Sequence, residues 1–190
     1  MARELGRMGY QVTRKGVSGA GLARPDFHDM SQELEALPIS PSTAAVFVYL
    51  GVNDAQAAWL YPAERGPSGL SSVPFEAPEW DAVYGRRTHD FLERICQRGA
   101  RRAVVLLPVD VDRPDLQQRL ARIRELQIRA ASSTSCAVTV QTAGDAGQFA
   151  VAGVPMRLPD GFHMSPRGAE VVWERILPEV LQLLEGDAPL

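Results

Sequence analysis

The chain has 190 residues, of which 45% are hydrophobic, and its formal net charge at pH 7 is −3. This length and composition suit a single α/β domain over residues 1–190, which would bury roughly 70% of the surface that the unfolded chain exposes. The 20 basic residues are scattered among 23 acidic ones, which excludes the positive stripe that nucleic-acid binding requires.

Short Val-rich runs separated by helical patterns predict βαβ units and a parallel sheet. Residues 2–8 have the pattern of a helix end, because Leu5 and Met8 lie on one face. In chain order, strands are predicted at residues 10–15, 44–50, 103–108 and 136–141. Apolar residues at helical spacing predict helices near residues 27–37, 84–95 and 114–123, the second of them ended by Gly99.

The last helix has the clearest signals in the sequence. Ser165 is a favourable N-cap, Pro166 suits the first helical position, and an apolar stripe continues from Ala169 to Leu184. Burial of this stripe should attach the helix to the sheet.

Two segments do not follow the alternation of strands and helices. Residues 55–81 form a long loop that contains four prolines and four aromatic residues, and residues 142–159 are rich in Gly and Ala. Ordered loops of this length commonly cover or line a site. We therefore expect the first to form a wall of a substrate site and the second to form another, more mobile wall.

The cysteines, the histidines and the hydropathy bear on redox state, metals and location. Cys96 and Cys136 have no ligand spacing and are expected to be buried, reduced thiols. His28, His89 and His163 lack zinc-ligand spacing, so neither a metal nor another cofactor is expected. No run approaches the roughly 18 apolar residues of a membrane span, and residues 1–15 lack a signal-peptide core. A cytoplasmic location is expected for the sequence as it stands, unless an upstream segment carries an export signal.

Three short motifs carry residue types that acyl transfer needs. His163 follows Asp160 by three residues just before the last helix, so one turn can hold the carboxylate against Nδ1. Asn53 follows the strand predicted at residues 44–50, where its amide could donate to an oxyanion or form an ordinary Asx turn. Gly19 lies in a glycine-rich turn after the first predicted strand, where a backbone N–H could be a second donor.

The order of the motifs Val17-Ser18-Gly19, Gly51-Val52-Asn53-Asp54 and Asp160-Gly161-Phe162-His163 resembles the SGNH (GDSL-like) hydrolase superfamily, over about residues 14–184. The resemblance implies a three-layer α/β/α sandwich with a flavodoxin-like parallel sheet. It also implies a serine esterase, acyl hydrolase or acyltransferase that acts on a small acyl ester.

The same resemblance implies a role for individual residues. Gly19 and Asn53 would be the oxyanion donors, Asp160 the orienting carboxylate and His163 the base. Residues 18–27 look like the equivalent block of bacterial members associated with acylated cell-surface carbohydrates, so the substrate could be an acylated saccharide. By position alone, the expected substrate contacts are Arg24, Asp54, Gln56 and Trp59. The oligomeric state is left open.

The nucleophile of the family is missing from its expected place. It normally precedes the residue equivalent to Gly19 by a strand, a turn and a helix, whereas Ser18 is the first serine in this sequence. Ser18 adjoins the expected donor and is a poor substitute. The first, central strand of the sheet should be missing too, which leaves its neighbours with unpaired backbone groups.

Three explanations of the missing nucleophile are open. The start of the protein is assigned too late, or a truncated pseudoenzyme keeps the scaffold for binding carbohydrate, or the strands at residues 10–15 and 44–50 pair directly and another site exists. A nucleotide-binding module is a further alternative, because Gly16, Gly19 and Gly21 form a glycine-rich turn, although their spacing is not the G-x-G-x-x-G of dinucleotide sites.

Overall fold

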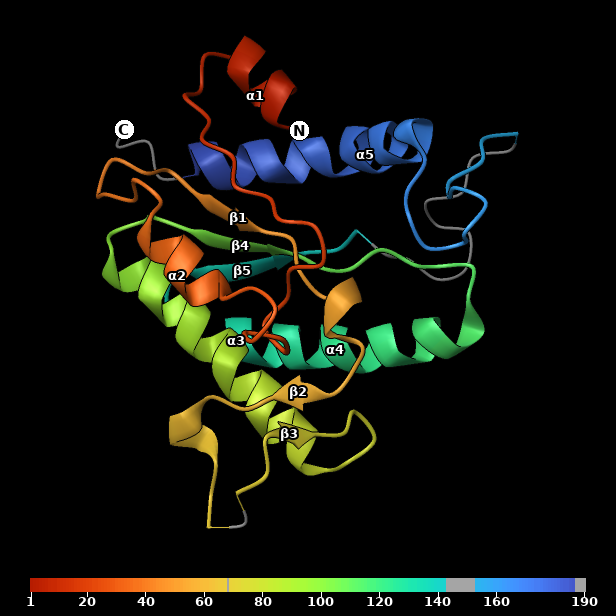
Figure 1. Cartoon of the computed structure of the whole chain (residues 1–190). Coiled ribbons are helices and arrows are strands. Elements are labelled where there is room, and N and C mark those ends of the chain that lie inside the picture. Colours follow the sequence, from red (N-terminus) through yellow and green to blue (C-terminus); the bar gives the residue numbers. More distant parts are fainter. Residues whose placement is uncertain (68, 143–152, 187–190) are drawn as a thin grey trace.

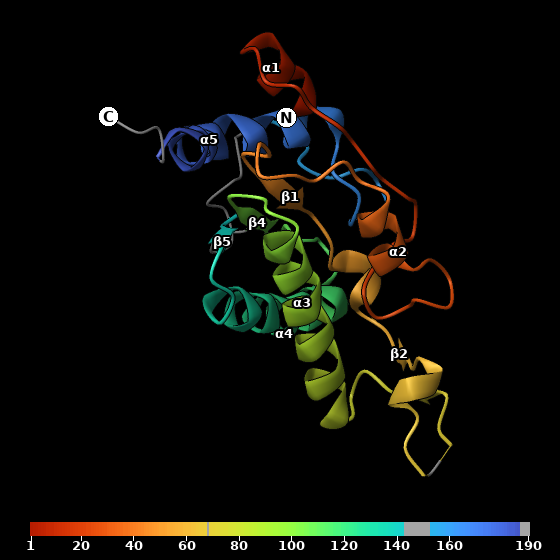
Figure 2. The ribbon, with the colours of Figure 1, turned by 90° about the vertical axis from the view of Figure 1, so that its left-hand side faces the viewer.

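The computed structural model describes residues 1–67, 69–142 and 153–186. A small parallel sheet lies between two helical layers: α5 covers one face, with α1 beyond it on the side away from the sheet, and α3 and α4 cover the other face (Figures 1 and 2). This arrangement confirms the three-layer α/β/α architecture that the sequence predicts. Within the described residues, no helix is both long and apolar enough to cross a membrane.

The sheet has three parallel strands in the order β1-β4-β5. They are β1 (Val46–Val48), β4 (Ala103–Leu106) and β5 (Ala137–Val140). Val46 is paired with Ala103, which in turn is paired with Ala137. All three strands form within the ranges predicted from the sequence. The central strand, β4, is buried along its whole length.

The strand predicted at residues 10–15 does not form. These residues are described without a strand, and all but Tyr10 are exposed. Val12 is the one aliphatic residue among residues 10–15, and Arg14 and Lys15 are charged. An extended conformation here would therefore bury little apolar surface. Direct pairing of this segment with β1 is therefore not observed, and β1 pairs with β4 alone among the described residues.

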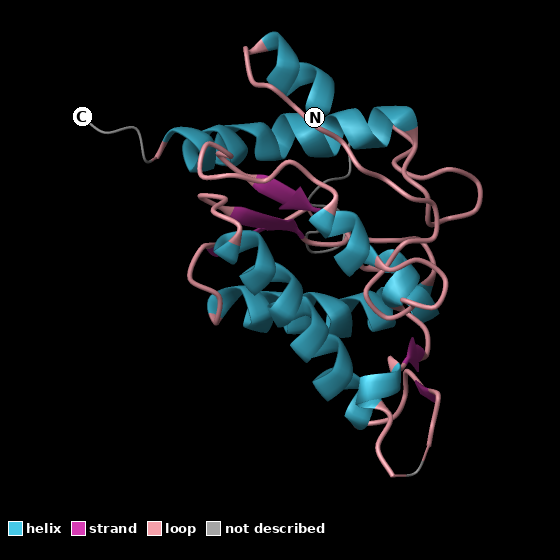
Figure 3. Ribbon diagram, turned by 60° about the vertical axis from the view of Figure 1, so that its left-hand side comes forward, coloured by secondary structure: helices cyan, strands magenta, loops and turns pink. Residues whose placement is uncertain are grey.

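Five α-helices and a small hairpin complete the described fold, and Figure 3 separates them by type. The helices are α1 (Ala2–Arg7), α2 (Met30–Glu35), α3 (Glu79–Gln97), α4 (Pro114–Ser132) and α5 (Pro166–Glu185). The hairpin pairs β2 (Ala58–Trp59) with β3 (Ser72–Val73), and short 3-10 helices are η1 (Val52–Asp54) and η2 (Pro62–Glu64). The long loop predicted at residues 55–81 thus contains η2 and the hairpin.

The caps explain where two of the helices begin. The Ser165 hydroxyl accepts the Gly168 N–H at 2.9 Å, and Pro166 is the first residue of α5, as the sequence predicts. The Asp29 side chain accepts the Ser31 N–H at 2.9 Å, so α2 begins later than the predicted residue 27. Phe27 is left 62% exposed in the preceding turn.

Alternate residues of the central strand enter two separate cores. Ala103 and Val105 of β4 belong to a large cluster with α3 and α4, whereas Val104 and Leu106 belong to a second cluster with α5. Leu5 of α1 is 4% exposed and lies in the second cluster. The period of two along β4 therefore attaches one helical layer to each face of the sheet.

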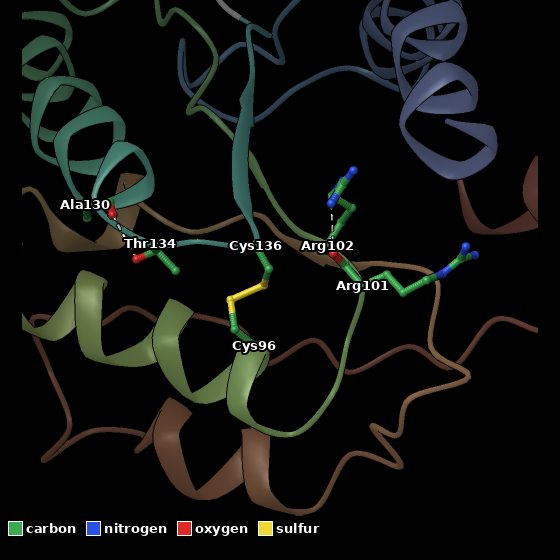
Figure 4. The surroundings of a disulfide bond; sticks show 6 residues. All are labelled: Cys96, Arg101, Arg102, Ala130, Thr134 and Cys136. Carbon is green, nitrogen blue, oxygen red and sulfur yellow. Dashed lines mark hydrogen bonds between the residues drawn. A yellow bond between two sulfur atoms is a disulfide. The ribbon is translucent and has the colours of Figure 1, made fainter. Parts of the chain in front are cut away.

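The two cysteines are not reduced thiols, which corrects the expectation from the sequence. Cys96 near the end of α3 and Cys136 just before β5 form a disulfide with a Cα–Cα distance of 5.8 Å (Figure 4). No pattern in the sequence indicates this pair, because the residues are separated by 40 positions and meet only through the packing of α3 on the sheet. The disulfide ties the helical layer to the sheet.

Candidate active site

Asp160 and His163 lie in contact in the turn that precedes α5. The His163 Nδ1 atom is 2.8 Å from an Asp160 carboxylate oxygen, and the other oxygen accepts the backbone N–H groups of Phe162 and His163 at 3.0 and 2.9 Å. The imidazole Nε2 atom therefore points away from the carboxylate. The side chain of His163 is 64% exposed, which leaves Nε2 accessible to a reactant.

The same contacts set the charge of the pair. The hydrogen bond from His163, followed by the two backbone N–H donors, lowers the pKa of Asp160 to about 2. Asp160 is thus a carboxylate at every physiological pH, and its contact with Nδ1 favours the Nδ1–H tautomer of His163. The turn therefore holds the carboxylate against Nδ1, as the three-residue spacing predicts.

Several contacts hold this turn at the edge of the sheet where the strands end. The Gly161 carbonyl accepts the N–H of Asp112, which lies beyond the end of β4, at 2.8 Å. Phe162 packs against the large core, and its ring centroid is 4.0 Å from that of His163. Figure 1 shows the segment before α5 on the side of the sheet toward which β1 and β4 run.

Asn53 lies in η1, just beyond the carboxyl end of β1. Its Nδ2 group donates one hydrogen bond to the Ala20 carbonyl at 3.0 Å and has a second N–H to give. The residue is exposed, as a donor to a substrate must be. Parallel strands end at the same edge of a sheet, so Asn53 and the turn with His163 lie at one edge.

Gly19 lies in the turn that Asn53 holds through Ala20. Its φ of +76° is in the left-handed region, and a Cβ atom here would lie 2.8 Å from the Phe27 ring. Within the described residues its backbone N–H has no recorded acceptor. A glycine is required both by the backbone conformation and by the close approach of Phe27.

A cavity of about 250 Å³ lies beside Asn53 and the turn that contains Gly19. It lies between the N-terminal segment and the residues that follow β1. Its walls include Lys15, Gly16, Val17 and Ala20 on one side and Tyr49, Gly51 and Asn53 on the other. The structure thus brings Asn53 and the turn containing Gly19 to one cavity, while Asp160 and His163 lie in the turn docked beyond β4.

The expected substrate contacts have mixed outcomes. Asp54 is fully buried, so it offers no surface to a substrate, which corrects the expectation from its position. Arg24 is paired with Asp26 and donates to Gln56 at 3.0 Å, so these two predicted contacts are neighbours in space. Trp59 is 36% exposed in β2.

The loop at residues 55–81 lines a second, larger groove. This groove measures about 400 Å³ and lies between α2 and α3, where Tyr61 and Glu64 of the loop face Arg87 and Phe91. Burial and the hydrogen bond to Asp29 raise the pKa of Tyr61 to about 12, which keeps its phenol protonated. Met30 borders both the groove and the smaller cavity. The second expected wall falls mostly on residues 143–152, which lie outside the described residues.

Three buried polar residues around this site are not predicted from the sequence. Tyr84, Arg87 and Gln127 are 0%, 8% and 1% exposed. Arg87 donates to the carbonyl groups of Leu22 and Trp59, and it pairs with Glu64. Tyr84 and Arg87 lie within the helix predicted at residues 84–95, where buried polar residues are usually bonded, whereas Gln127 lies beyond the helix predicted at residues 114–123.

Gly51 offers a test of the geometry between β1 and Asn53. Its φ is +142°, and a Cβ atom would lie 2.3 Å from Pro108 Cγ. Gly51→Ala is expected to lower the free energy of unfolding by about 2 to 3 kcal/mol through strain and overpacking. Gly16→Ala is the matched control, because a Cβ atom there meets nothing within 4 Å. Equal urea midpoints for both variants would contradict this geometry.

The comparisons with known proteins agree with the fold. A profile of the family DUF459, described as a protein of unknown function, matches residues 1–179. A comparison with curated proteins gives no match. A carbohydrate esterase family 3 structure from Talaromyces cellulolyticus is similar at 15% identity, with a TM-score of 0.59 over 95% of this chain and 75% of that one.

Two further crystal structures are similar at the same identity of 15%. An acetyl esterase with a serine-to-alanine substitution and an acetate ion has a TM-score of 0.58 over 92% of this chain and 72% of that one. An alpha/beta hydrolase enzyme from the metagenome of Lake Arreo, Spain, has a TM-score of 0.66 over 95% and 77%. At this identity the likeness concerns the fold.

Proposed function

The chain belongs to DUF459, a family known as SGNH-like, and on this premise we propose that it is a serine esterase or acyltransferase that acts on a small acyl ester. The observation that carries the proposal is the Asp160–His163 pair, with its 2.8 Å contact and an exposed imidazole. The backbone N–H groups of Phe162 and His163 occupy one oxygen of Asp160 and shape the turn, whereas the contact of the other oxygen with Nδ1 orients the imidazole. A carboxylate on Nδ1 is the arrangement that general-base catalysis by histidine requires.

In the proposed reaction, His163, Asp160, Gly19 and Asn53 act together with a serine. His163 Nε2 takes the proton from a serine hydroxyl, whose oxygen attacks the ester carbonyl, and Asp160 stabilises the resulting imidazolium. The Gly19 N–H and the free N–H of Asn53 bind the oxyanion. The imidazolium then protonates the leaving alcohol, and a water molecule releases the acyl group by the same steps. Loss of one such donor typically lowers kcat by about 10²- to 10³-fold.

The serine is proposed to come from a segment that pairs with the free edge of β1. Val46 donates its N–H to Arg102 at 2.9 Å, so the N–H and C=O of the next residue, Phe47, point to the opposite edge. A parallel strand on that edge would end at the 250 Å³ cavity beside Asn53. The turn that follows such a strand is a suitable place for the nucleophile.

The larger groove supports an acylated saccharide as the substrate. Its lining includes the Tyr61 ring, which has the Arg87 guanidinium over one face, and the carboxylates of Asp29 and Asp90. Aromatic faces accept the C–H surfaces of a sugar, and carboxylates accept hydrogen bonds from its hydroxyl groups. Because Met30 borders both cavities, the sugar could lie in the groove while its ester reaches the smaller cavity.

The disulfide supports a proposed location in an oxidising compartment, in place of the cytoplasmic location expected from the sequence. A bond such as Cys96–Cys136 persists where thiols are not kept reduced, as in the periplasm or outside the cell. Acylated cell-surface carbohydrates would be accessible there. Alkylation of free thiols in intact cells, followed by mass spectrometry of both cysteine peptides, would test this location.

The test of the function is labelling with a fluorophosphonate probe together with turnover of p-nitrophenyl acetate. Both assays are applied to the 190-residue chain and to the protein extended by its upstream codons. We expect an adduct on one serine only in the extended protein. An adduct within the 190-residue chain, lost in His163→Ala, would overturn the proposed origin of the nucleophile. No adduct and no turnover in either protein would overturn the esterase.

A carbohydrate-binding pseudoenzyme is the second candidate, and the large groove favours it. The groove lies apart from the Asp160–His163 turn and has its own polar and aromatic walls, so it needs no nucleophile to hold a sugar. Saccharide binding by calorimetry without ester turnover in the extended protein would support this candidate over the esterase.

A further inference from the structure

Asp54 is a fully buried carboxylate with a partner on each oxygen. Its Oδ1 atom accepts the Ala23 N–H at 2.7 Å, and its Oδ2 atom accepts the Tyr84 hydroxyl at 3.2 Å. Burial of an unpaired carboxylate is costly, so these partners are required for the fold to tolerate the group.

The buried side of the network anchors Asp54 to the helical layer. Gln127 of α4 donates to the Tyr84 hydroxyl at 3.1 Å and to the Leu50 carbonyl at 3.0 Å. Leu50 immediately precedes the turn that contains Asn53. The network therefore fixes Asp54 relative to α3, to α4 and to the end of β1.

The exposed side of the network holds the loop that contains Gly19. Asn53 donates to the Ala20 carbonyl at 3.0 Å, while its neighbour Asp54 accepts the Ala23 N–H. Between these contacts, a Cβ atom on Gly21 would lie 2.4 Å from Asp54 Oδ1, so the loop is pressed against the carboxylate. Asn53 and Asp54 thus each form a hydrogen bond with one end of the four-residue segment 20–23.

We propose that Asp54 is a positioning residue that locks the loop of Gly19 against the turn of Asn53 and so sets the distance between the two oxyanion donors. This inference rests on the proposed function for its catalytic meaning. Its structural content, the clamp between the Ala23 N–H and the carboxylate, can be measured without any turnover.

The charge of Asp54 gives the clamp a pH dependence. Tyr84 and Arg87 face it from α3, the loop supplies the N–H groups of Leu22 and Ala23, and α4 contributes the uncharged Gln127 through Tyr84. Burial outweighs these contacts and raises the pKa of Asp54 from 3.8 to about 7. The folded pKa lies above the unfolded one, so the stability from this group is present below about pH 4 and is lost as pH rises through about 7.

The first experiment is ¹H–¹⁵N NMR of the 190-residue chain between pH 5 and 8.5. The Ala23 amide is expected to titrate with a midpoint near the Asp54 pKa of about 7. Asp54→Asn should abolish the titration but keep the amide protected, whereas Asp54→Ala should accelerate its hydrogen exchange by about 10-fold or more. Glu125→Gln, which removes an exposed carboxylate of α4, is the control for loss of charge.

The outcomes separate this inference from the proposed function. Two results together would overturn the clamp, whatever the ester assays show. The Ala23 amide would not titrate in the natural chain, and its hydrogen exchange would not be faster in a folded Asp54→Ala variant. With an active extended protein, Asp54→Ala should lower kcat by about 10²-fold with little change in KM, and Asp54→Asn should restore much of it. A folded Asp54→Ala variant with unchanged kcat would overturn the catalytic meaning. Titration of Ala23 without turnover in any protein would retain the clamp and reject the esterase.

Discussion

His163→Ala is expected to lower ester turnover of the extended, fluorophosphonate-reactive protein by about 10⁶-fold, the scale seen when a triad histidine is removed. The reason is that Nε2 has to take the serine proton and return it to the leaving alcohol. Asp160→Asn should cost about 10⁴-fold, because an amide on Nδ1 no longer favours the correct tautomer or stabilises the imidazolium. The measurement is initial-rate hydrolysis of p-nitrophenyl acetate.

The control for these variants is His89→Ala. His89 lies on α3 in contact with Asp90. Its substitution therefore removes another histidine–carboxylate pair from the surface and leaves the turn before α5 unchanged. Full activity of His163→Ala, or equal losses in His163→Ala and His89→Ala, would exclude His163 as the base. A loss in His163→Ala that exceeds the loss in Asp160→Asn is the pattern of a base and its orienting group.

The parts of the site that could be predicted from the sequence are local in the chain. Asp160 and His163 are three residues apart, so a single turn brings them together, and Ser165 and Pro166 fix where the following helix begins. Asn53 could be placed because it directly follows an apolar strand. In each case the neighbours in sequence are also the neighbours in space.

The parts that could not be predicted depend on contacts between distant segments. Asp54 has the position of a substrate contact until the packing of Tyr84, 30 residues away, shows that it is buried. The strand predicted at residues 10–15 has extended character, but a strand also needs a neighbour with which to pair. The same limit applies to the cysteines, since only the docking of α3 on the sheet brings Cys96 to Cys136.

Removal of the disulfide has the largest expected effect on stability. The bond closes a loop of 40 residues, and a loop of this size corresponds to about 4 kcal/mol of unfolded-state entropy at 25 °C. Cys96→Ala combined with Cys136→Ala should therefore lower the free energy of unfolding by about that amount, or lower Tm by roughly 10 °C for a domain of this size. Urea unfolding and thermal circular dichroism measure the two quantities.

Dithiothreitol separates loss of the bond from loss of packing. It should destabilise the natural protein nearly as much as the double alanine variant and leave that variant unaffected, because the variant has no bond to reduce. The loop closed by the disulfide includes β4 and α4, so cleavage should also release the end of α3 from the start of β5 and speed amide exchange there first. Equal stability with and without dithiothreitol, together with alkylation of two thiols in the folded protein, would show that the bond is absent and would restore the reduced cysteines predicted from the sequence.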